Sequence, residues 1–436
     1  MMTHLSIKNI GLLLLSTMLL LACETDFTNP GAASEDQVLN SANGLIGLAV
    51  GAQKRWSVGR QSPIYATVTA AGFTTGELRL INPGNEAENE MALGYNNVTG
   101  NTGIVNNIWT QALLTRNEAQ KVIDNAEAIP NVSTRNAVVA YASIFHALAN
   151  GTLAGFFEQV PLVTEENAKF SPASAALDEA IRVLENVRGT QNDPALEARM
   201  PGGADGIDIP NTIEALLARY YLQAGRYDEA IAAANNVDRT ATSVFTYEDV
   251  NTNPIAFVSI LTNNVYQPID LTLGLPEELQ PDTNDQRLAF YFTDLMPEGN
   301  DFRAAAFFDA IDDAIPVYVP GEMDLIIAEA AARSNDIPAA IAALNAVLTK
   351  QPADDPFGIG AALPAYSGPQ TQEAVLDAIY TNRAMEMMMS GLRLVDSRRF
   401  GRPGPNDANP ERNRNFYPYP FSERDNNPNT PPDPDI

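Results

Sequence analysis

The 436-residue sequence has one cysteine, two histidines and two tryptophans. A single thiol excludes a disulfide within the chain. The histidines are His4 and His146. A Ser-His-Asp triad therefore has no supporting arrangement beyond a single histidine, and no cluster of Cys and His offers a zinc site. Glycine-rich loops of the Walker or dinucleotide-binding type are also missing, and the acidic loops 205–208 and 282–285 lack the spacing of a calcium loop. We therefore expect no catalytic residue, no cofactor and no metal site.

Lysine is also scarce, with five lysines beside 22 arginines, and the formal net charge is −27. Phosphate contacts need a basic surface, so this charge argues against a nucleic-acid partner. It also argues against direct adhesion to anionic lipid. A surface this acidic raises salt adaptation of the source as a side hypothesis.

Long apolar runs are absent apart from residues 10–21, which are too few to span a bilayer core of about 30 Å. Ala22 and Cys23 follow Leu21, the last residue of this run, an arrangement that resembles the bacterial lipobox, in which the cysteine is acylated after cleavage. The alternative is an ordinary secretory signal with an incidental cysteine. We expect residues 1–22 to be a lipoprotein signal peptide, Cys23 to be the lipid attachment site and residues 23–40 to be a flexible tether.

Helical periodicity dominates the first half of the remaining chain. It predicts helices over residues 41–59, 63–75, 104–126 and 133–153, and another after Ser171-Pro172. Ser133 is the expected N-cap of the fourth of these helices. Residues 80–102 are rich in Asn, Gly and Glu and predict a long surface loop, which is often functional.

A helical-hairpin pattern at residues 218–231 recurs 110 residues later at 328–341. Gly225 and Asn335 fall at corresponding turns, where a left-handed backbone is needed and both residue types tolerate it. The pattern is typical of the tetratricopeptide hairpin. Strict contiguous repeats are not present, so a free-standing solenoid is the weaker interpretation.

Two segments, about 240–320 and 351–370, lose this periodicity and gain Asn, Pro, Asp and aromatic residues. Short strands are plausible there, for example over residues 315–319. We expect both insertions to pack together on one side of the helical scaffold. The predicted fold class is therefore all-α, with tetratricopeptide-like hairpins and a large irregular loop-rich lobe, in one domain over residues 41–436.

The chain closes on a long helical run predicted at residues 371–401. Its last part places an acid among three guanidiniums, in the group Arg393, Asp396, Arg398 and Arg399. Cations at a helix C-terminus stabilise terminal carbonyls, and an acid among them can be bonded bidentately. A structural ion-pair cluster is the favoured interpretation, and a ligand site is the alternative.

This run resembles the C-terminal signature of the SusD/RagB family of outer-membrane nutrient-binding lipoproteins, roughly E-R-x-x-E-L-x-x-E-G-x-R-x-x-D-L-R-R-x-G. The matching residues are Arg383, Glu386, Gly391, Arg393, Asp396, Arg398, Arg399 and Gly401. Asn382 and Ser390 depart from the pattern where the family has glutamates, and Ser397 departs where it has an apolar residue. Residues 155–162 and 417–428 resemble further family elements, the F-G-x-V-P-L turn and the terminal P-I-P element.

The resemblance implies non-catalytic capture of a nutrient, most often an oligosaccharide, and its delivery to a SusC-like TonB-dependent transporter in the outer membrane. It also implies that the ligand lies on the loop-rich face. Sugar rings stack on aromatic side chains while their hydroxyls bind polar groups. The candidate ligand residues in irregular segments are Trp56, Phe73, Arg79, Tyr95, Tyr266 and Tyr291. For each aromatic residue, core packing is the competing interpretation.

Three alternatives remain open. A peptide-binding member of the same family would differ only in its cargo. A surface glycoside hydrolase would use a carboxylate pair, which 54 acidic residues always permit. A tetratricopeptide adaptor would bind a protein and ignore glycans. His146 lies within an apolar helix and is expected to be a core residue.

Overall fold

The computed structural model describes residues 33–262 and 264–436. The predicted signal peptide at 1–22, the lipid attachment site Cys23 and the first part of the tether lie outside these residues. The tether was predicted to extend to residue 40, but its described part contains the helix α2 (Glu35–Leu39), which begins with a capping box at Ser34 and Gln37.

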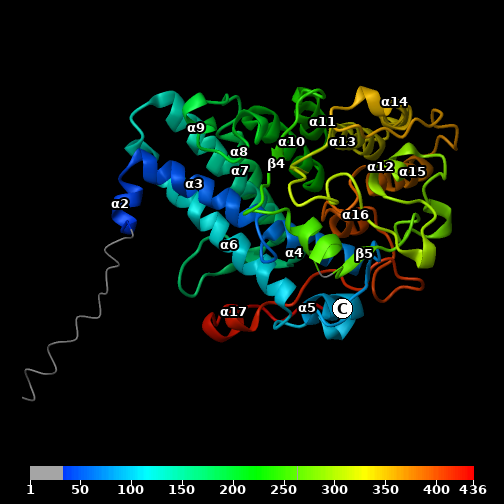
Figure 1. Cartoon of the computed structure of the whole chain (residues 1–436), viewed down its shortest axis with the longest axis horizontal. Helices are drawn as coiled ribbons and strands as arrows, with labels where there is room; N and C mark the ends of the chain where they lie inside the picture. The colour runs from blue at the N-terminus through cyan, green and yellow to red at the C-terminus, as the bar shows by residue number, and fades with distance from the viewer. Residues whose placement is uncertain (1–32, 263) are drawn as a thin grey trace, which may run out of the picture.

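Helices dominate the described chain, and strands occur only as short antiparallel pairs, so the predicted all-α class is confirmed (Figure 1). The further helices are α3 (Ala42–Ser57), α4 (Pro63–Thr74), α5 (Glu86–Leu93), α6 (Gly103–Asp124), α7 (Val132–Phe156), α8 (Ala173–Glu185), α9 (Pro194–Glu197), α10 (Ile209–Gln223), α11 (Tyr227–Asn236), α12 (Gln286–Tyr291), α13 (Pro320–Arg333), α14 (Ile337–Leu348), α15 (Gln372–Glu386), α16 (Arg393–Arg399) and α17 (Phe421–Asn426). The strand pairs are β1 (Leu78–Leu80) with β5 (Tyr266–Pro268), β2 (Gln159–Pro161) with β3 (Phe170–Pro172), and β4 (Val244–Phe245) with β6 (Ile315–Pro316).

The long helix α7 lies at the centre of the scaffold, packed between α6 and α8 (Figure 1). Among the described residues it alone is long and apolar enough to cross a membrane, yet 83% of its apolar window is buried inside the fold. Its composition is therefore explained by its place in the core. His146 lies on this helix and is buried, as predicted, within 3.1 Å of the Asn150 amide. Burial, followed by the charge of Arg116, lowers the pKa of His146 to about 4, so the ring is neutral.

The two predicted helical hairpins are confirmed as α10–α11 and α13–α14, each packed closely within itself. Gly225 and Asn335 stand at their turns with φ of +74° and +63°. The left-handed backbone is thus used where the sequence predicts it.

Replacing Gly225 with alanine is expected to destabilise the fold by about 1–2 kcal/mol, because the backbone of an L residue is strained at this positive φ. The added Cβ would meet no neighbour, so this strain is the whole effect. The matched control is Gly47→Ala, on the exposed side of α3, where the added Cβ also meets no neighbour. There the change improves helix propensity by up to about 1 kcal/mol. Chemical denaturation measures both variants, and equal effects would contradict the explanation from φ.

Three local predictions differ from the structure. The N-cap of α7 is Asn131, which accepts from the Thr134 backbone N–H at 3.1 Å, and Ser133 instead donates to Asp193. Ser171 and Pro172 belong to β3, and α8 begins after them without a side-chain cap. The predicted loop 80–102 contains α5, whose stripe of buried residues is too short to reveal a helix by its periodicity.

The two irregular insertions contact each other, as predicted. The Gln286 N–H donates to the Ala361 carbonyl at 3.1 Å, and the rings of Phe307 and Phe357 meet edge to face with centroids 5.5 Å apart. Both lie toward the right of the molecule in Figure 1. The strand predicted at 315–319 is present only as β6.

The continuous helical run predicted at 371–401 is wrong, because α15 ends at Glu386 and α16 begins at Arg393. Between them Met389 has φ +56° and Gly391 has φ +81°, values that no α-helix allows. The chain turns here against α4, where a Cβ on Gly391 would lie 3.1 Å from Thr67. The break thus places α16 against the first half of the chain.

Candidate functional site

The charged signature on α16 forms a buried ion-pair network. Asp396 accepts from Arg383 at 2.8 Å and from Arg399 at 2.9 Å. Arg399 also pairs with Glu329 on α13 at 2.7 Å. Burial alone would raise the pKa of Asp396 and of Glu329, but the neighbouring guanidiniums outweigh it and hold both pKa values below their usual range. The network joins α13, α15 and α16, which agrees with the structural interpretation.

The other signature residues also hold elements together. Arg393 donates to the Tyr380 hydroxyl at 3.2 Å, and its guanidinium lies 5.3 Å from the centre of that ring. Arg398 donates to the carbonyls of Asn415 and Gly155, so it links α16 to the end of α7.

Four of the predicted ligand residues are core residues in this structure. Trp56, Phe73, Tyr266 and Tyr291 are at most 5% exposed. Phe73 meets Tyr266 edge to face at 5.7 Å, and the Tyr291 hydroxyl donates to the Glu386 carbonyl at 2.7 Å. In this conformation none of the four offers a ring face at the surface.

Arg79 lies in a polar cluster beside the β1–β5 pair. It donates to the Gln267 amide oxygen at 3.2 Å, and Gln267 in turn donates to Asp301 at 2.6 Å. The hydrogen bond from Gln267, assisted by the nearby Arg303, lowers the pKa of Asp301. The cluster fixes the insertion against β1.

Tyr95 is the one predicted aromatic that reaches the surface, with 39% of its area exposed. It lines an open groove of about 420 Å³, a volume suited to a small ligand or to part of a polymer. The other walls are residues 73–76, 274–276 and 409–413. We call this the Tyr95 groove, and it brings Phe73 and Tyr95 together while leaving the other four predicted residues out.

The groove is built from segments far apart in the sequence. The Asn413 N–H donates to the Thr74 carbonyl at 2.9 Å, which fixes the C-terminal segment beside α4. The Arg414 guanidinium donates to the Tyr95 carbonyl at 2.6 Å and holds that residue in its left-handed turn, with φ of +46°. Gly94 lies directly against the Asn413 side chain, where a Cβ would come within 2.3 Å of the amide nitrogen.

The two charged side chains that line the groove are turned to partners within the fold. Glu411 pairs with Arg402 at 2.6 Å, while Arg412 turns inward to Asn415 at 2.7 Å. Asn413 also lines the groove, but its Oδ1 atom is buried and has no hydrogen-bond partner within the described part of the chain. An exposed aromatic ring in a groove lined by polar side chains is a suitable arrangement for the face and the hydroxyls of a sugar. Sequence reasoning missed Asn413, because no motif links it to Tyr95.

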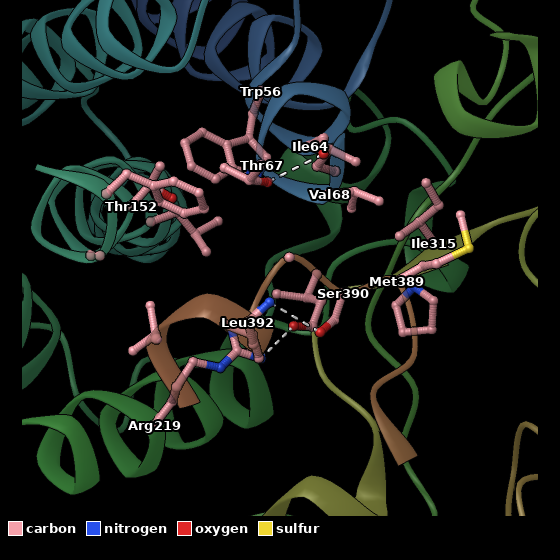
Figure 2. A pocket seen from close by; sticks show the side chains of 18 of the residues that line it. Trp56, Ile64, Thr67, Val68, Thr152, Arg219, Ile315, Met389, Ser390 and Leu392 are labelled. Carbon is pink, nitrogen blue, oxygen red and sulfur yellow. Dashed lines mark hydrogen bonds between the residues drawn. The ribbon is translucent and has the colours of Figure 1, made fainter. Parts of the chain in front are cut away.

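A second, more enclosed space lies between the helices (Figure 2). This central pocket has about 120 Å³ and is walled by Trp56 of α3, Val68 of α4, Thr152 of α7, Arg219 of α10 and the turn at Ser390. It is too small for a polymer chain. Among residues 33–262 and 264–436 there is no group of three or more His, Cys, Asp or Glu residues placed to hold a metal ion.

No protein-family model matches the chain, and no curated protein matches it. Solved structures do. A SusD superfamily protein from Bacteroides thetaiotaomicron VPI-5482 aligns over 90% of this chain and 100% of its own, with a TM-score of 0.70 and 17% identity. A SusD-like carbohydrate binding protein from Bacteroides vulgatus ATCC 8482 aligns over 82% of this chain and 83% of its own, with a TM-score of 0.64 and 17% identity. Another SusD-like carbohydrate binding protein, from Bacteroides fragilis NCTC 9343, aligns over 90% of this chain and 99% of its own, with a TM-score of 0.63 and 13% identity.

These similarities show that the chain has the SusD-like fold over nearly all of its described length. The resemblance seen in the sequence is thereby confirmed at the level of the fold.

Proposed function

We propose that this protein is a cell-surface lipoprotein that captures an oligosaccharide or polysaccharide without cleaving it. The observation that carries the proposal is the Tyr95 groove, an open surface site with an exposed ring and several polar side chains, on a SusD-like fold. Two structures with this fold are described as carbohydrate binding proteins, which supports a glycan as the ligand. In this role Tyr95 stacks on a sugar ring and the polar side chains that line the groove bind its hydroxyls.

The proposal extends to the cell surface and to transport. Cys23 would carry the lipid anchor in the outer membrane, and a SusC-like TonB-dependent transporter would receive the glycan. In Figure 1 the described chain begins near α2, which lies well away from α5, the helix that ends two residues before Tyr95. Co-purification of the transporter from gently solubilised membranes tests this part, and its consistent absence would contradict it.

The glycan part is tested by titrating the unacylated chain, residues 24–436, with a panel of polysaccharides and peptides while products are analysed. Retention of a glycan without cleavage is the expected result. Cleavage would favour a surface glycoside hydrolase, and binding only to peptides would favour a peptide carrier. Binding only to a protein would favour the tetratricopeptide adaptor.

Gly94→Ala is expected to weaken glycan binding roughly tenfold, because the new Cβ would displace the Asn413 amide from the groove. Its control is Gly59→Ala, which also places an L residue at positive φ (+86°) but meets no neighbour. Gly94→Ala should lose more stability because of the clash, and only Gly94→Ala should lose affinity in a binding titration at a temperature where both variants are folded. Equal affinity of the two variants would show that Asn413 does not contact the ligand.

A further inference from the structure

The central pocket is bounded in part by glycines of α7 that lie against side chains of neighbouring helices. A Cβ on Gly151 would lie 2.4 Å from the Tyr220 ring, and one on Gly155 would lie 3.0 Å from Val395. Gly151 and Gly155 thus let side chains of α10 and α16 pack directly against the backbone of α7. A side chain at either glycine would press on Tyr220 or Val395, which both line the pocket, so the glycines preserve the shape of this space.

The chemistry of the wall limits what can occupy this space. Arg219 is neutralised by Glu322 at 2.6 Å and also donates to the Val317 carbonyl at 2.9 Å. Tyr220 is only 4% exposed, and no residue in the described ranges bonds its hydroxyl. Burial raises the pKa of Tyr220, so its phenol stays protonated and remains a hydrogen-bond donor.

The rest of the lining carries no charge. Trp56 supplies an aromatic wall and Ile315 an aliphatic one, while the lining residue Ser390 is exposed and marks the rim. A charged ligand would find no counter-charge here and would lose its hydration. An apolar ring would find contacts on several sides.

We propose that the central pocket is a second binding site, for a small neutral molecule with a single ring and a hydrogen-bond acceptor that meets the Tyr220 hydroxyl. The volume fits such a molecule, since an apolar cavity of about 150 Å³ accommodates benzene. The pocket shares no lining residue with the Tyr95 groove, so this site is independent of glycan capture.

The probe for the test is 4-fluorobenzyl alcohol, followed by its ¹⁹F signal as it is titrated with the full chain in detergent. Saturable binding in the millimolar range or tighter is expected, with 4-fluorobenzoate at least tenfold weaker because the site lacks a free cation. No saturable binding of the alcohol, or equal binding of the benzoate, would overturn the proposal.

Tyr220→Phe removes only the donor and should weaken binding of the alcohol about threefold to tenfold. Tyr221→Phe is the matched control, since the Tyr221 hydroxyl bonds Glu185 outside the pocket at 2.5 Å. Ser390→Phe at the exposed rim should block entry of the alcohol into the pocket. This second variant tests the site even if Tyr220→Phe fails to fold. Unchanged binding in Ser390→Phe, or equal effects of the two tyrosine changes, would contradict this site. Glycan binding at the Tyr95 groove should stay unchanged in all three variants.

Discussion

Asp396→Asn is expected to destabilise the protein by about 3–5 kcal/mol, the range found when one partner of a buried ion pair is removed. The carboxylate is bonded by Arg383 and Arg399, and all three side chains are nearly inaccessible to water. The amide keeps the shape but not the charge. Arg399 retains Glu329, whereas Arg383 keeps only a distant contact with that acid at 3.9 Å. A buried cation without a close counter-charge is the source of the loss.

The matched control is Asp377→Asn, whose side chain is 44% exposed and pairs with Arg402 at 3.2 Å. Exposed pairs contribute about 0–1 kcal/mol, so chemical denaturation should separate the two variants clearly. A similar small loss in both would show that the network contributes little to stability.

The same network gives a pH dependence with a defined sign. The folded-state pKa of Asp396 lies below its usual value, so its contribution is fully present above the unfolded-state pKa of about 4. That contribution is lost as the pH falls through the lower folded-state pKa. The stability difference between the wild type and Asp396→Asn should therefore be constant near neutral pH and shrink below about pH 4. A difference that grows on acidification would contradict this assignment.

Tyr95→Ala is expected to raise the Kd for the captured glycan about 30-fold, corresponding to about 2 kcal/mol for the loss of a central aromatic contact. The residue is exposed and lies at the rim of the fold, so stability should change little. Its ring is the only surface-reaching one among the aromatic residues predicted to bind the ligand. Isothermal titration with the glycan identified in the panel measures the effect.

Tyr366→Ala is the matched control, because Tyr366 is a partly exposed tyrosine that does not line the Tyr95 groove. Its affinity for the glycan should equal that of the wild type. If Tyr366→Ala weakened binding while Tyr95→Ala did not, the ligand would lie elsewhere on the irregular lobe.

Much of the fold is predictable from the sequence, because local signals and tertiary contacts agree there. Amphipathic periodicity locates the long helices, and Gly225 and Asn335 locate two turns by their tolerance of positive φ. The break before Gly391 was missed for a physical reason. Apolar residues continue through Met387–Met389 at helical spacing, and only the contact with Thr67 on α4 shows why the backbone turns.

The candidate site is less predictable. Aromatic residues in irregular segments pack in a core as readily as they line a groove, and sequence does not separate Tyr266, which is buried, from Tyr95, which is exposed. Asn413 joins Tyr95 only through tertiary contacts across more than three hundred residues. Long-range pairing of this kind leaves no local pattern.

The most direct test of the account is a binding titration of residues 24–436 with polysaccharides, run on the wild type and Tyr95→Ala with simultaneous analysis of products. The account predicts saturable retention of one glycan by the wild type, no cleavage products and strongly reduced retention by the variant. Release of shortened products, or equal retention by both proteins, would contradict capture at the Tyr95 groove.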